Sequence, residues 1–173
     1  MVPRTHLAID RRLCGEPLDP EGTAAGTARV GLTTVPEMAA DAAGLVHGGF
    51  VFGLADHAAM LAINHPNVVL GSAEVRFLLP VTVGERLVAE ATLAETAGRK
   101  SRVRVEVRRA TAGAAAEAAE AGTAAGAAGE PGAAVLSGEL VCFTLDRHVL
   151  EPAGGEGGGR RQAEPQAPPA AGA

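Results

Sequence analysis

Aromatic residues and long hydrophobic runs are nearly missing from this sequence. Its 173 residues include no tryptophan or tyrosine and only four phenylalanines. No run of about 18 apolar residues occurs, so the sequence predicts no membrane-spanning helix. The first 30 residues carry several charges and lack the apolar core of a signal peptide, so we expect none.

Cysteine and positive charge are also scarce. The two cysteines, Cys14 and Cys142, lie far apart in the sequence, which argues against a disulfide framework and against a metal-binding knuckle. We therefore expect a reduced, cytoplasmic protein without metal or cofactor. The formal net charge is −5 and stacking aromatics are few, so nucleic acid is not an expected partner.

Alanine, glycine and proline dominate the sequence instead. There are 37 alanines, 23 glycines and 11 prolines, 71 in all, and they concentrate in residues 110–133 and 151–173. Neither segment has the large apolar side chains needed to offset its ordering entropy. We predict a mobile loop for the first, with a short helix over 114–121 as the alternative, and a disordered tail for the second. The pattern of the remaining sequence predicts a single domain over residues 27–150. An N-terminal extension, residues 1–26, precedes this domain.

The hydrophobic pattern of this domain predicts one helix among five strands. Small and apolar residues at helical spacing predict a helix over 48–63, ended by Asn64 and the following His-Pro pair. Alternation and flanking turn residues predict the strands, at 27–35, 68–79, 85–95, 102–109 and 135–145. Because the later connections are short or form a stretched hairpin, we expect an α+β domain in which a curved antiparallel sheet wraps one long central helix.

A His-Gly-Gly motif, His47, Gly48 and Gly49, opens the predicted helix. Glycines there let a ligand approach the backbone, and the unpaired N–H groups of a first helical turn stabilise a developing oxyanion. A tight turn into a buried helix is the alternative explanation. Asp56 lies in an apolar stretch of the same helix, where a carboxylate is costly unless paired or used. The alternative is a solvent-facing Asp56 beside His57.

Four features resemble the hotdog-fold acyl-CoA thioesterases: His47-Gly48-Gly49, an acid nine residues after the histidine, Ala58-Ala59, and the strand end Phe77-Leu78-Leu79-Pro80. The resemblance is closest to the PaaI-type branch, which is related to the 4-hydroxybenzoyl-CoA thioesterases. It covers about residues 27–145 without the alanine-rich insert. It implies the hotdog fold and an acyl-CoA substrate.

The resemblance also implies roles for individual residues. The Gly48 N–H would polarise the thioester carbonyl, Asp56 would act as nucleophile or general base, and His47 would help to hold the thioester. Gly49 and Asp41 are expected substrate contacts, although relatives often have asparagine at the position of Asp41. Some relatives carry a water-positioning hydroxyl one turn after the acid, where this chain has Met60.

Helix geometry places Gly48 and Asp56 too far apart to serve one substrate within a single chain. The two residues are eight positions apart, which is about 12 Å along a helix. A thioester carbonyl cannot lie within reach of both. We therefore expect the site at a homodimer interface, in a dimer or a dimer of dimers, with each chain supplying one of the two residues, as in paired hotdog subunits.

Basic residues cluster after the predicted third strand and along the fourth, at Arg99, Lys100, Arg102, Arg104, Arg108 and Arg109. Of these, Arg99, Lys100 and Arg102 are expected to bind the phosphates of coenzyme A. The alternative is a solvated strand face. Together these features predict hydrolysis of an acyl-CoA thioester, and a non-catalytic acyl-CoA-binding module of the same fold is the alternative. A hydratase is disfavoured, because the adjacent Asp56 and His57 point about 100° apart on a helix.

Overall fold

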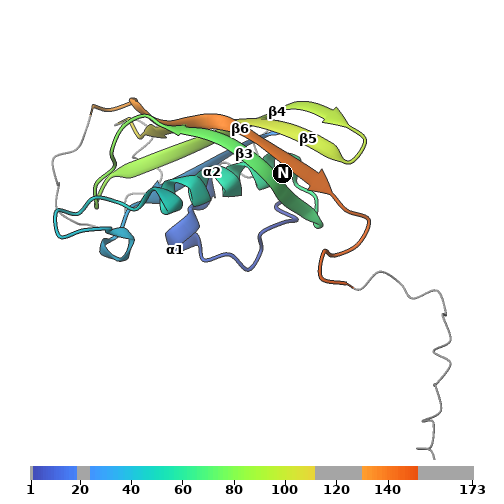
Figure 1. The fold of residues 1–173 in the computed structure, drawn as a ribbon, viewed down its shortest axis with the longest axis horizontal. Helices are drawn as coiled ribbons and strands as arrows, with labels where there is room; N and C mark the ends of the chain where they lie inside the picture. Colours follow the sequence, from blue (N-terminus) through green and yellow to red (C-terminus); the bar gives the residue numbers. More distant parts are fainter. Residues whose placement is uncertain (1, 19–23, 112–129, 152–173) are drawn as a thin grey trace, which may run out of the picture.

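A curved antiparallel sheet packs around one long helix in the computed structural model, which describes residues 2–18, 24–111 and 130–151 (Figure 1). The helix, α2 (Gly48–Ile63), lies between the sheet and a one-turn helix, α1 (Arg11–Cys14). None of the helices in these ranges has the length and apolar content needed to cross a bilayer. The predicted loop and tail fall mainly on residues 112–129 and 152–173, outside the described part.

The sheet has six strands in the order β1-β2-β4-β5-β6-β3. Their bounds are Glu16–Leu18 for β1, Thr27–Thr33 for β2, Val68–Phe77 for β3, Arg86–Ala97 for β4, Lys100–Arg109 for β5 and Ala134–Thr144 for β6. Every neighbouring pair is antiparallel. The predicted α+β architecture and the antiparallel sheet around one central helix are therefore confirmed. The outermost strands are β1 and β3.

Helix α2 matches the predicted span, and its ends show why. His47 caps the N-terminus with its side chain, and Asn64 ends the helix in a left-handed conformation, with φ at 51°. Ala55, Ala58 and Ala59 are completely buried along the helix. Their small side chains let the sheet approach α2 closely, which explains an alanine-rich core that has few aromatic residues.

The N-terminal extension contains structure that the sequence pattern did not predict. Its α1 and β1 have four and three residues, too few to show a period. Gly15 between them has φ at 90°, and a side chain there would approach Leu54 to 2.7 Å. Asn64 holds the start of the extension, since its side chain accepts from Arg4 N–H and donates to the Val2 carbonyl. This segment therefore covers the face of α2 opposite the sheet.

Strand β5 shows the predicted alternation. Val103, Val105 and Val107 are buried against the core, as expected. Arg109 continues the inward parity and is also buried, where it pairs with Glu85. The prediction placed Arg109 in an exposed basic group, and the structure corrects this, because an inward arginine finds a carboxylate partner beneath the sheet.

Candidate active site

The loop before α2 is shaped by Asp41. Its carboxylate accepts hydrogen bonds from the backbone N–H groups of Ala43 (2.9 Å) and Leu45 (3.1 Å). The N–H of His47 then donates to the Met38 carbonyl at 2.9 Å, which anchors the start of the helix. The observed contacts of Asp41 are thus to its own loop, which positions His47.

Only one of the first amides of α2 is left open among the described residues. The Gly49 N–H donates to Nδ1 of His47 and the Phe50 N–H donates to the His47 carbonyl, both at 3.0 Å. The Gly48 N–H has no acceptor in the same part of the chain. Because Nδ1 of a neutral His47 accepts a hydrogen bond, its proton lies on the exposed Nε2. Gly48, rather than Gly49, is therefore the amide available to a ligand.

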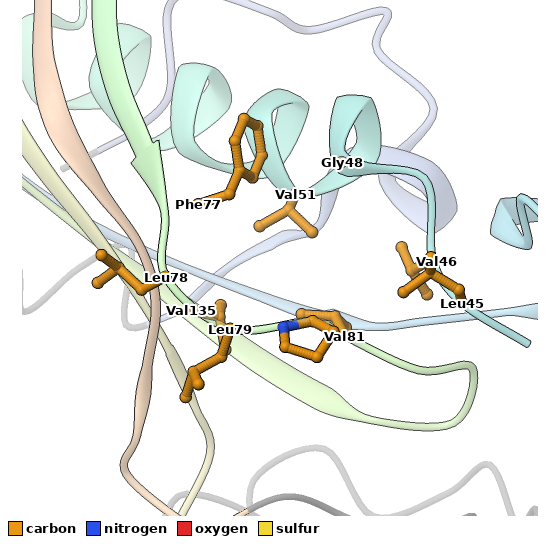
Figure 2. A pocket seen from close by; sticks show the side chains of 10 residues that line it. Leu45, Val46, Gly48, Val51, Phe77, Leu78, Leu79, Val81 and Val135 are labelled. Carbon is orange, nitrogen blue, oxygen red and sulfur yellow. The ribbon is translucent and has the colours of Figure 1, made fainter.

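A cavity of about 330 Å³ lies beside Gly48 (Figure 2). Its walls come from the entrance of α2 (Leu45, Val46, Gly48, Val51), from residues 77–81, and from Val135 on β6. The Phe77 ring lies against the first helical turn, so that a side chain on Gly48 would approach Phe77 Cε1 to 3.0 Å. All lining side chains are apolar.

Asp56 lies in the middle of α2 and does not line this cavity. Its Oδ1 atom is buried without a hydrogen-bond partner in the described part of the chain. Burial raises the pKa of Asp56, and nearby His57 opposes this only in part. After burial itself, the Asp56 carboxylate helps to raise the pKa of Cys142 on β6 to about 12. Asp56 is thus half-buried with one carboxylate oxygen enclosed by the protein, and a fully solvent-facing Asp56 is not what the structure contains.

His57 faces a different neighbour from Asp56. It is 2% exposed, and its Nδ1–H donates to the Cys14 carbonyl of α1 at 3.0 Å. The His6 ring lies 5.9 Å away, centroid to centroid. Burial is the main reason why the pKa of His57 is lowered. His57 therefore ties α2 to the N-terminal segment.

The predicted phosphate ligands lie at the other end of the subunit. Arg99 lies in the β4–β5 turn, and Lys100 begins β5, where it pairs in register with Phe143 next to the start of β3. Gly48 lies against Phe77 at the end of β3, and that strand's ten residues span about 30 Å. The structure does not bring Arg99, Lys100 or Arg102 to Gly48 within one chain.

Two of these basic side chains already have acidic partners. Arg99 pairs with Asp146, and Arg102 pairs with Glu139 at 2.6 Å and with Glu95 at 3.6 Å. A cavity of about 620 Å³ lies beside Arg99 and is also lined by Arg147 and His148. Neither of these two residues was among the predicted site residues, although they form an adjacent basic pair in the sequence.

An ion pair that the sequence did not reveal fixes one wall of the apolar cavity. Arg109 Nε lies 2.5 Å from Glu85 Oε2, and Arg109 Nη2 donates to the Pro80 carbonyl at 2.6 Å. The other Glu85 oxygen accepts from the N–H and hydroxyl of Thr82. Burial opposes ionisation of Glu85, but the bonds from Arg109 and Thr82 outweigh it and lower the pKa.

The fold and the site together define a hotdog protein, in which one central helix presents an open amide at its start and an unpaired carboxylate in its middle. The sequence pattern of the thioesterase superfamily matches residues 43–116. This stretch includes the His-Gly-Gly motif, Asp56 and the predicted basic residues. The chain belongs to the thioesterase superfamily.

Solved structures support this assignment. An uncharacterized protein from Pyrococcus horikoshii is 45% identical, with a TM-score of 0.69 over 87% of this chain and 100% of that one. A mutant of the phenylacetic acid degradation protein PaaI from Thermus thermophilus is 26% identical, with a TM-score of 0.58 over 77% of this chain and 95% of its own.

One curated relative is considerably longer than this chain. Over 103 residues, 60% of this chain, the sequence is 52% identical to methylthioribose-1-phosphate isomerase from Aquifex aeolicus. The match spans 22% of that protein. The chain therefore corresponds to about a fifth of the length of this relative.

Proposed function

We propose that the protein hydrolyses an acyl-CoA thioester to a free acid and coenzyme A, in the cytoplasm, where reducing conditions keep thiols free. The observation that carries this proposal is the buried Oδ1 of Asp56, which has no partner in the described residues. A carboxylate whose pKa is raised by burial is a stronger base than an exposed one. The similarity to methylthioribose-1-phosphate isomerase does not enter this proposal, because the matched segment is only 22% of that protein.

The reaction uses two groups of α2. The Gly48 N–H donates to the thioester oxygen as negative charge develops there, while the exposed Nε2–H of His47 is a second donor that helps to hold the thioester. Asp56 either attacks the carbonyl carbon or takes a proton from the attacking water. The C–S bond then breaks, and the sulfur of coenzyme A leaves as a thiolate that is protonated to the thiol. If Asp56 attacks, water then hydrolyses the acyl-Asp56 anhydride to the free acid. If water attacks, the free acid forms directly.

The exposed edge of β3 supports a site shared between two copies. This strand is ten residues long at an outer edge of the sheet, and Leu70, Phe77, Leu78 and Leu79 on and after it are more than a third exposed. Antiparallel pairing of two such edges about a two-fold axis buries these side chains. It also sets the end of one β3 beside the start of the other.

This arrangement gives the distant basic residues a role. In one copy, β3 ends at Phe77, next to Gly48. This end meets the start of β3 in the second copy, and Arg99 and Lys100 of that copy lie close to that start. Arg99, Lys100 and Arg102 of one copy then bind coenzyme A phosphates while Gly48 of the other holds the thioester. Asp41 and Gly49 shape the entrance through their bonds within it.

The first experiment measures thiol release from acyl-CoA by Asp56→Asn. We expect kcat to fall about 10²- to 10⁴-fold, because the base or nucleophile is lost. Asp10→Asn is the matched control, since Asp10 is an exposed cap of α1 and asparagine caps equally well. Unchanged turnover by Asp56→Asn would overturn the assignment.

A second experiment separates the loss of the Gly48 N–H from the effect of an added Cβ. Gly48→Pro replaces the N–H by a ring at the first helical position, where proline is tolerated after the extended His47. Gly48→Ala adds the same Cβ next to Phe77 and keeps the N–H. We expect a loss of about 10²- to 10³-fold in kcat for Gly48→Pro relative to Gly48→Ala. Equal activities would remove Gly48 from the mechanism.

Mixing the two inactive variants tests the shared site. In a random mixture of Gly48→Pro and Asp56→Asn chains, half of the dimers are mixed, and each contains one intact site. About a quarter of wild-type activity should therefore return. If both residues act within one chain, mixing restores nothing.

A non-catalytic acyl-CoA-binding module remains the second candidate because of one residue. Met60, one turn after Asp56, is 1% exposed and supplies no hydroxyl to orient water. Saturable binding of acyl-CoA without thiol release by the wild-type protein would favour this second function over hydrolysis.

A further inference from the structure

The cavity beside Gly48 offers an acyl group no polar partner among the described side chains. Those that line it are aliphatic or aromatic throughout, with Val51, Phe77, Leu79 and Val135 approaching from the helix and from the sheet (Figure 2). The polar part of the lining is therefore backbone. The carbonyl groups of Leu45, Val81 and Val135 each accept a backbone hydrogen bond already, from Ala40, Val46 and Leu78 respectively.

The cavity is also held in shape before any ligand arrives. Pro80 lies in its wall, and the Pro80 carbonyl accepts from buried Arg109. Next to it, the Thr82 carbonyl accepts from the Thr34 hydroxyl at 2.8 Å, and Val46 N–H donates to Val81 at 2.8 Å. A wall fixed in this way cannot easily move to provide a polar partner that it lacks.

The position of the cavity connects it to the reacting carbonyl. The Phe77 ring lies next to Gly48, and Val51 follows one helical turn later on the cavity wall. A thioester oxygen bound to the Gly48 N–H therefore leaves the first carbons of its acyl group against Phe77 and Val51. With about 30 Å³ for each water-sized group, a volume of about 330 Å³ holds about ten non-hydrogen atoms.

We propose that this cavity selects acyl-CoA substrates whose acyl group is wholly apolar and has up to about ten non-hydrogen atoms. It rejects acyl groups of the same size that carry a hydroxyl or a carboxylate, because those groups lose water and meet no polar side chain in the described wall. This inference rests on the proposed function for its substrate class, while the selection itself is a property of the cavity.

The first test compares matched substrates. Benzoyl-CoA against 4-hydroxybenzoyl-CoA and hexanoyl-CoA against adipoyl-CoA differ by one polar group each. We expect the polar member of each pair to have kcat/KM lower by about 30-fold or more. In a series from butanoyl- to hexadecanoyl-CoA, kcat/KM should rise about three- to four-fold per methylene and level off near ten carbons. Equal kcat/KM within both pairs, or a rise that continues to hexadecanoyl-CoA, overturns the proposal.

Variants then assign the selection to the cavity. Leu45→Asn places an amide in the wall at a position that is 39% exposed and outside the β3 edge, so folding should be preserved. We expect the preference for benzoyl- over 4-hydroxybenzoyl-CoA to fall at least several-fold in this variant. Leu7→Asn is the matched control, because Leu7 is 66% exposed and outside the cavity. An unchanged preference in Leu45→Asn contradicts the role of this wall.

Binding separates this proposal from the proposed function. Calorimetric titration of Asp56→Asn with the same four acyl-CoA molecules measures selection without turnover. A preference for the apolar members supports the cavity assignment even where hydrolysis is not detected in the wild-type protein. Equal affinities within both pairs overturn it, whether or not thiol is released.

Discussion

Two acids illustrate how differently this fold treats a carboxylate. Glu85 is 7% exposed and uses both oxygens, one toward Arg109 at 2.5 Å and the other toward Thr82. Asp56 buries Oδ1 with no partner in the described residues. The bonds of Glu85 outweigh its burial and lower its pKa, whereas burial raises the pKa of Asp56.

The difference separates a carboxylate whose hydrogen bonds stabilise the fold from one whose ionised form lacks such bonds. Glu85 is ionised and fully bonded, so it holds the loop around Pro80 in place. Asp56 makes no compensating bond through Oδ1 within the described residues, and its ionised form is costly in the folded protein. Groups of this kind cluster at functional sites, which is why we propose a chemical role for Asp56 and a structural one for Glu85.

The largest expected effect is the loss of the Glu85 charge. Glu85→Gln leaves the Arg109 guanidinium buried without its counter-ion, and we expect the free energy of unfolding to fall by about 3–5 kcal/mol. Urea unfolding of the variant measures this change. Replacing both partners together, as Glu85→Leu with Arg109→Met, should cost less than Glu85→Gln alone. A stability equal to wild type in Glu85→Gln would contradict the structural role.

Asp56→Asn should move stability in the opposite direction. The amide has no charge to desolvate, so we expect the free energy of unfolding to rise by about 1–2 kcal/mol at neutral pH. The same urea titration measures it, with Asp10→Asn as the exposed control that should not change. A destabilised Asp56→Asn would mean that the carboxylate is satisfied in solution, and the contrast with Glu85 would then fail.

Acid should remove each contribution. The pKa of Asp56 is raised in the fold, so the folded protein binds this proton first and the advantage of Asp56→Asn shrinks as pH falls toward the ordinary value of 3.8. The pKa of Glu85 is lowered, so its stabilisation is complete above 4.5 and is lost as pH falls through the folded-state pKa. Urea unfolding of wild type, Asp56→Asn and Glu85→Gln from about pH 3 to about pH 7 measures both contributions. A pH-independent difference between wild type and Asp56→Asn would contradict the expectation for Asp56.

The smallest expected effect concerns His57. His57→Gln removes the hydrogen bond to the Cys14 carbonyl, and we expect a loss of about 1 kcal/mol at neutral pH. Because burial lowers the pKa of His57, its contribution is present above 6.5 and is lost as pH falls below it. The variant should therefore lose less stability than wild type between about pH 7 and about pH 5. An identical pH profile would show that His57 is not buried in its neutral form.

Sequence patterns predicted the long elements and failed where structure depends on distant partners. Helix α2 over Gly48–Ile63 and the alternation of β5 extend over enough residues for a period to show. The three residues of β1 are too few for a period to show. The pairing of Arg109 with Glu85 joins positions 24 apart in the chain, so no local pattern contains it.

The site was predicted in part for the same reason. The sequence indicates an acid in an apolar helix and two glycines at its start, but the hydrogen bonds decide which amide is open. His47 occupies the Gly49 N–H and leaves that of Gly48 without an acceptor in the described residues. The burial of Asp56 Oδ1 likewise depends on surrounding elements that its neighbours in sequence do not reveal.

The unequal outer strands of the sheet have a consequence for assembly. Strand β1 has three residues, and Pro17 in its middle has no N–H to offer, whereas β3 has ten residues. Copies that pair through β3 use up both long edges, and the short edges that remain cannot template a further chain. In the pairing proposed above, growth by strand addition would therefore stop at two, because β1 offers no second long edge.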